Sequence, residues 1–82
     1  MIGINTKRYL AFQQENEKND YGYVTISTFI TNILGSTWTT ITKEKILRDC
    51  KILLEKGMVY EVETMRKRKG YALKEGYTVD GL

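Results

Sequence analysis

The chain has 82 residues, of which 41% are hydrophobic and 11% aromatic, so we expect one small globular domain. With one cysteine and no histidine, the sequence excludes an internal disulfide and a zinc site built from cysteine and histidine. The net charge is +3, and residues 43–74 hold ten lysines or arginines against five acidic residues. This distribution is typical of a protein that binds a polyanion.

The first elements in chain order are a helix and a short strand. Residues 6–18 are predicted to form a helix with Thr6 as its N-cap, and the polar run that ends at Asp20 is expected to stop it. Residues 23–26 are aromatic or β-branched, which predicts a brief strand.

A second, short helix is expected after this strand. Ser27 is its predicted N-cap and Gly35 its predicted end. Its apolar face is formed by Phe29, Ile30, Ile33 and Leu34. Residues 36–41, which include Trp38, are predicted to connect it to the next helix.

The helix pattern is clearest over residues 43–56. Thr42 is the predicted N-cap and Gly57 the residue that ends the helix. Charged side chains lie away from a continuous apolar stripe, which is predicted to face the core. The stripe consists of Ile46, Leu47, Cys50, Leu53 and Leu54.

A β-hairpin is predicted to follow. Residues 58–64 alternate in polarity, residues 65–70 form a charged loop that ends in glycine, and residues 71–74 return as a strand. The last residues, from Glu75 onward, have no periodicity and are expected to form a loose tail, with Tyr77 and Val79 as the side chains that pack back.

Residues 41–59 resemble the recognition-helix signature of the winged helix-turn-helix family. In that signature a polar cap precedes a β-branched core residue, followed by two more apolar positions, Leu-x-x-x-Gly, and an apolar pair that enters the wing. These positions are filled here by Thr42, Ile46, Cys50, Leu53, Gly57, Met58 and Val59. The 36–41 connector is longer than the tight turn that the family usually has between its second and third helices.

The resemblance covers residues 6–75 and is closest to bacterial, plasmid and viral regulators and replication initiators. It implies an α+β fold, with a three-helix core, a short strand before the second helix and a C-terminal β-hairpin wing. Residues 1–75 would form the winged-helix domain and residues 76–82 a C-terminal tail.

The resemblance also implies that the chain binds double-stranded DNA and regulates transcription. The major groove of B-DNA admits one α-helix, whose first turns contact the bases, so we expect helix 43–56 there and the 65–70 tip on the backbone or in the minor groove. Arg48 is a candidate for guanine recognition, and we expect Lys45 and Arg48 to face outward alongside the 65–70 loop as one continuous positive surface. The predicted DNA-binding residues are Thr40, Thr42, Lys43, Glu44, Lys45, Arg48, Arg66, Lys67, Arg68 and Lys69.

Two alternatives remain open at this point. A winged helix also serves as a protein-interaction module, either as an adaptor or as an inhibitor of a host protein; a single-stranded DNA or RNA partner is less favoured. Self-association as a homodimer fits either function. We expect no enzymatic activity, cofactor, metal or small-molecule ligand, and a cytoplasmic protein, because no segment resembles a signal peptide or a membrane span.

Overall fold

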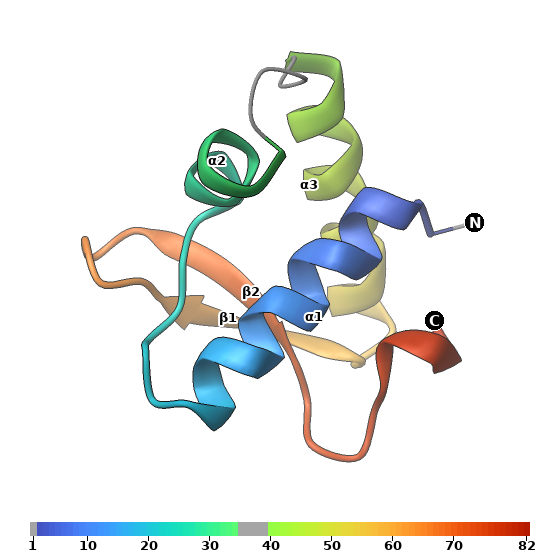
Figure 1. Ribbon diagram of the computed structural model, residues 1–82. Helices are drawn as coiled ribbons and strands as arrows, with labels where there is room; N and C mark the ends of the chain where they lie inside the picture. Colours follow the sequence, from blue (N-terminus) through green and yellow to red (C-terminus); the bar gives the residue numbers. More distant parts are fainter. Residues whose placement is uncertain (1, 35–39) are drawn as a thin grey trace.

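The computed structural model describes residues 2–34 and 40–82 of the chain. They form three α-helices and a two-stranded antiparallel sheet (Figure 1). This α+β layout is compatible with the predicted winged helix. In chain order the elements are α1 (Ile4–Lys18), α2 (Ile26–Phe29), the π-helix η1 (Ile30–Leu34), α3 (Thr40–Glu55), β1 (Val59–Glu63), β2 (Lys69–Leu73) and the 3-10 helix η3 (Val79–Gly81).

Helix α1 ends at Lys18 as predicted, but it begins at Ile4 with Gly3 as its N-cap. The prediction that Thr6 caps this helix is therefore wrong. Thr6 lies inside the helix and is fully buried. Its hydroxyl donates a 2.8 Å hydrogen bond to Asp49 of α3, so it links two helices and caps neither.

The predicted strand at residues 23–26 is also absent: residues 21–25 are neither helix nor strand and pair with no strand of the described chain. Side chains of α1 hydrogen-bond to the backbone amide and carbonyl groups of this segment that a neighbouring strand would otherwise pair with. The Val24 amide donates to Gln13 Oε1 (3.0 Å), and the Val24 carbonyl accepts from Tyr9 Oη (2.9 Å) and Gln13 Nε2 (2.9 Å).

Helix α2 begins one residue before the predicted cap. Its N-cap is Thr25, whose hydroxyl oxygen accepts from the Thr28 amide at 3.0 Å, and Ser27 is the second residue of the helix. The physical reason is packing. Ile26, Phe29 and Ile30 follow the helical i, i+3, i+4 spacing and are buried together, so the helical turn has to include Ile26.

The continuation of α2 departs from the predicted apolar face. The π-helix η1 has wider turns than an α-helix, which changes the rotation from one residue to the next. Ile33 is consequently exposed although it was predicted to share the face of Ile30. Gly35 and most of the predicted 36–41 connector, including Trp38, lie outside the described residues.

Helix α3 starts at Thr40, so the prediction that Thr42 is its N-cap is wrong. Threonine has a weak helix propensity that tertiary context readily overrides. The predicted end is confirmed. Gly57 has φ +74°, the Gly57 amide donates to the Leu54 carbonyl (3.0 Å) and the Met58 amide donates to the Leu53 carbonyl (3.0 Å), which is a Schellman motif.

The core lies where α1, α2 and α3 meet above the hairpin. Ile46, Cys50 and Leu53 are buried as predicted, while Leu47 and Leu54 are half-buried at its edge. Against this face of α3 pack side chains of the other elements, among them a Tyr9–Phe29 pair whose ring centroids lie 5.4 Å apart at 65°.

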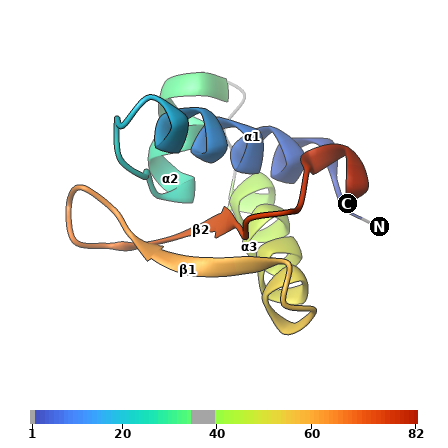
Figure 2. The same cartoon turned by 90° about the horizontal axis from the view of Figure 1, so that it is seen from below.

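The predicted hairpin is confirmed, with shifted bounds: β1 is one residue shorter at each end than the predicted 58–64, and β2 begins at Lys69, two residues before the predicted 71–74 strand, and ends at Leu73. Val59 pairs with Leu73 and Glu63 with Lys69 at the two ends of the ladder. Glu61 and Glu63 are exposed, as the alternating pattern predicts. The tip of the hairpin projects beyond the helices, whereas its base lies against α3 (Figure 2).

The C-terminal residues fold back onto the domain. Val79 and Leu82 are partly buried against the core, and the Tyr77 carbonyl accepts a 3.3 Å hydrogen bond from Gln14 of α1. Tyr77 itself is exposed. Among the residues described, no helix has the length and apolarity needed to cross a membrane.

Candidate nucleic-acid interface

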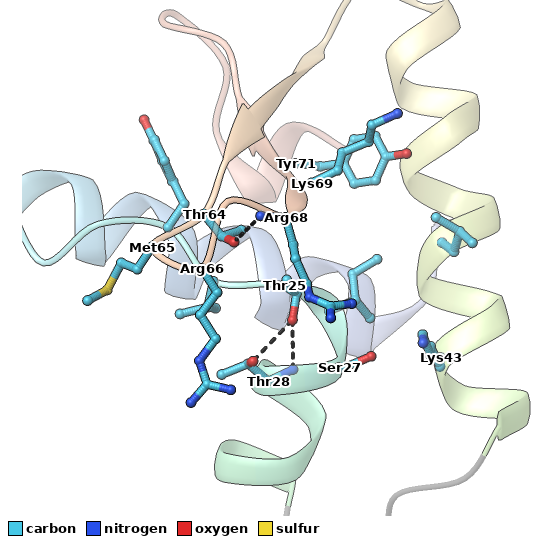
Figure 3. A pocket seen from close by; sticks show the side chains of 14 residues that line it. Thr25, Ser27, Thr28, Lys43, Thr64, Met65, Arg66, Arg68, Lys69 and Tyr71 are labelled. Atoms are coloured by element: carbon cyan, nitrogen blue, oxygen red, sulfur yellow. Dashed lines mark hydrogen bonds between the residues drawn. The ribbon is translucent and has the colours of Figure 1, made fainter.

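An open groove of about 1130 Å³ lies between α2, α3 and the hairpin tip (Figure 3). Partly or fully buried apolar side chains, including Val24, Ile26 and Leu47, contribute to its lining. Four exposed cations from two separate elements contribute as well: Lys43, Arg66, Arg68 and Lys69. None of the fourteen lining residues is acidic, so the groove is positively charged.

Three of these cations have no acidic partner. No carboxylate of the described chain lies within ion-pair distance of Lys43, Arg66 or Arg68. Lys69 is different, because its Nζ lies 2.7 Å from Glu61 Oε2. That hydrogen bond and the Glu61 charge raise the pKa of Lys69 and offset its charge toward a ligand.

Side chains from opposite walls meet over the groove. Figure 3 shows Arg66 and Arg68 extending from the hairpin toward α2, where Thr25 and Thr28 lie, while Lys43 comes from α3. The Thr25 hydroxyl donates to Thr28 Oγ1 at 3.1 Å. Since Thr28 Oγ1 accepts that bond, its own hydrogen remains available for an anion.

Sequence reasoning missed this contribution from α2. Thr25, Ser27 and Thr28 line the groove, yet only Ser27 was singled out, and then as a helix cap. The sequence did contain one signal for this site. Three hydroxyl side chains lie at the start of the helix that precedes the cationic helix α3. The proximity of these hydroxyl side chains to the hairpin tip is a tertiary contact, which no pattern of neighbouring residues predicts.

Lys45 does not line the groove with Lys43. At roughly 100° per residue, the two side chains point to nearly opposite sides of α3. Lys45 Nζ lies 3.0 Å from Asp49 Oδ1, on the side of α3 that faces the start of α1. The expectation that Lys45 and Arg48 form one positive surface with the hairpin tip is therefore wrong: Lys45 faces α1, and Arg48 is exposed on α3 but does not line the groove.

Asp49 is the buried hydrogen-bond acceptor that links this side of α3 to the start of α1. It is 1% exposed and accepts from the Gly3 amide (2.9 Å) and the Thr6 hydroxyl (2.8 Å). Burial alone would raise the pKa of Asp49, but the hydrogen bonds from Gly3, Lys45 and Thr6 outweigh it and lower the pKa. Asp49 is thus a structural anion, which the i, i+4 spacing from Lys45 could have suggested.

The remaining predicted site residues whose side chains the structure describes lie outside the groove lining. Glu44 and Arg48 are exposed on α3, and Lys67 is exposed at the hairpin tip. Thr42 is half-buried in the first turn of α3. Thr40 begins this helix, and its side chain is outside the part that the structure describes.

No known protein-family model, curated protein or solved structure matches this chain. The functional assignment therefore depends on the geometry and charge of the groove. In the described ranges, no group of three or more histidine, cysteine or carboxylate side chains is placed to hold a metal ion. Burial raises the pKa of the Cys50 thiol to about 12, so this cysteine stays protonated inside the core.

A buried polar cluster fixes the hairpin relative to the helices. Tyr9 Oη accepts from the Tyr71 amide (3.2 Å), and Gln13 Nε2 donates to the Tyr71 carbonyl (3.0 Å). Burial raises the pKa of Tyr9, which keeps its hydroxyl protonated. At Gly70 a Cβ atom would lie 2.8 Å from the Val24 carbonyl oxygen, so the hairpin approaches the 21–25 segment as closely as only glycine allows.

Proposed function

We propose that this chain is a winged-helix domain that binds double-stranded DNA, as a small transcriptional regulator or as the origin-recognition part of a replication initiator. The observation that carries the proposal is the groove in which α3 and the hairpin tip contribute four cations and no acidic residue. Clustered, unpaired cations attract the phosphate backbone, and this attraction supplies most of the sequence-independent affinity for DNA.

In this proposal α3 enters the major groove and the hairpin contacts the flanking backbone. Lys43 is the α3 cation that shares the groove with Arg66 and Arg68, and these three side chains are unpaired. The Thr28 hydroxyl adds a neutral donor on the α2 side. Exposed Arg48, outside the groove, is the side chain proposed to contact a base edge.

The test is a fluorescence anisotropy titration of the protein onto a random-sequence duplex over a range of salt concentrations. Three phosphate contacts give a slope of log K against log salt of about −2.7, or roughly a 40-fold loss of affinity between about 50 and 200 mM salt. Replacing both Arg66 and Arg68 with glutamine should reduce the slope by about 1.8.

The matched control removes two cations elsewhere. Arg8 and Lys18 are exposed on α1, outside the groove lining, and neutralising both leaves the groove intact. Equal effects of the two double variants would contradict the proposal, and so would the absence of salt-sensitive duplex binding.

A protein-interaction module is the second candidate. The apolar side chains in the groove favour it, because an acidic peptide with apolar residues would contact both the cations and Val24, Ile26 and Leu47. In that case an acidic protein partner would bind while a duplex in excess would fail to displace it.

A further inference from the structure

The tip of the hairpin presents an apolar side chain among cations. Met65 is 76% exposed, more than any other large apolar side chain in the described part of the chain. The four residues that follow it are Arg66, Lys67, Arg68 and Lys69, all exposed. This combination fits a partner with a charged exterior and an apolar interior, and a DNA duplex has phosphates outside and stacked bases inside.

Hydrogen bonds to a single residue hold the tip in shape. The Thr64 amide donates to the Arg68 carbonyl (2.8 Å), the Lys67 amide donates to the Thr64 carbonyl (2.9 Å), and the Arg68 amide donates to Thr64 Oγ1 (3.1 Å). Thr64 is itself buried. Met65 and Arg66 are therefore the central residues of a closed turn, and both side chains are exposed.

The Met65 side chain is also supported from below. A Cβ atom at Gly22 would lie 3.1 Å from Met65 Cγ, so the side chain lies directly over the Gly22 backbone. Lys67 has φ +60°, a conformation that favours glycine. A lysine at this strained position adds a cation at the tip, which is consistent with binding to an anion.

We propose that the hairpin tip enters the minor groove of duplex DNA and that Met65 inserts between two base pairs, while Arg66 and Arg68, two of the three unpaired groove cations, contact the flanking phosphates. This inference rests on the proposed function. Apolar wedges of this kind unstack one base step and bend the duplex by about 20–90° toward the major groove. Steps such as TA deform most easily, so we expect sites that contain one to be preferred.

The test uses a duplex of about 30 base pairs with a central TA step, labelled with a donor dye at one end and an acceptor at the other. Wild-type protein at saturation and low salt should increase energy transfer, because bending brings the ends together. Met65→Leu keeps an apolar wedge and should bend the duplex as well. Met65→Ala should leave energy transfer at the value of the free duplex.

Two further measurements separate the outcomes. 2-Aminopurine at the TA step should brighten with wild-type and Met65→Leu protein, and stay quenched with Met65→Ala. Ile4→Ala is the matched control, because Ile4 is 70% exposed on α1 and is not part of the groove. This variant should bend the duplex as wild type does.

Bending retained in Met65→Ala, or wild-type binding without bending, would overturn the wedge and leave DNA binding intact. The slope of affinity against salt reports on the phosphate contacts alone. If no salt-sensitive duplex binding is seen with wild-type protein, the proposed function itself is wrong, and the wedge falls with it.

Discussion

Replacing Gln13 with leucine tests the physical account of the missing third strand. Leucine has nearly the size of glutamine but no hydrogen-bonding groups. The Val24 amide would lose its acceptor and the Tyr71 carbonyl its donor, while the Val24 carbonyl would keep Tyr9 Oη. Two backbone groups would thus be left unpaired beneath α1.

The magnitude follows from this count. An unpaired buried polar group costs about 1–3 kcal/mol, so two groups predict a loss of roughly 2–6 kcal/mol in the free energy of unfolding. In a domain of this size each kcal/mol lowers the melting temperature by about 4–8 °C, so a loss at the lower end of this range, about 2 kcal/mol, predicts a decrease of roughly 8–16 °C. Urea and thermal unfolding followed by far-ultraviolet circular dichroism would measure both quantities.

The adjacent glutamine provides the control. Gln14 makes one exposed hydrogen bond of 3.3 Å to the Tyr77 carbonyl, so Gln14→Leu should change the stability by less than about 0.5 kcal/mol. If the Gln13 and Gln14 variants were equally stable, the carboxamide would not be replacing strand pairing, and the explanation of the unpaired 21–25 segment would be wrong.

Two further predictions concern the anion on α3 and the hairpin tip. Because the folded state lowers the pKa of Asp49, this carboxylate stabilises the protein above its unfolded pKa of about 3.9, and the contribution is lost as the pH falls through the folded pKa. Asp49→Asn should therefore be less stable than wild type by about 1–3 kcal/mol at neutral pH, with a difference that shrinks in acid; a constant difference in urea titrations from neutral to acidic pH would argue against this role. Lys67→Gly should raise the free energy of unfolding by roughly 0.5–1 kcal/mol, because glycine relieves the left-handed conformation at φ +60° but also loses more entropy on folding. A melting temperature of Lys67→Gly below that of wild type would contradict the inference that the Lys67 backbone is strained.

The parts of the fold that sequence predicted well are those with local causes. The apolar stripe from Ile46 to Leu53 defines α3 by its spacing alone, and Gly57 marks its end because the left-handed conformation there favours glycine. The hairpin follows from alternation and from a charged loop between two strands. In each case the residues that determine the structure are neighbours in the chain.

The parts that could not be predicted depend on distant partners. Residues 23–26 have strand composition, but the side chains that hydrogen-bond to the Val24 backbone come from α1, more than ten positions earlier. Similarly, Lys45 and Lys43 look equivalent in the sequence. Helix geometry places them on nearly opposite sides of α3, but only the contacts of Asp49 with Gly3 and Thr6 show which of the two sides faces α1.

The hydrogen bonds of Tyr9 and Gln13 also make the residue type at each of these positions depend on the other. Both side chains bond to the backbone at residues 24 and 71, so losing one leaves the other with incomplete partners. In a divergent chain we expect the two residues to be kept or replaced as a pair.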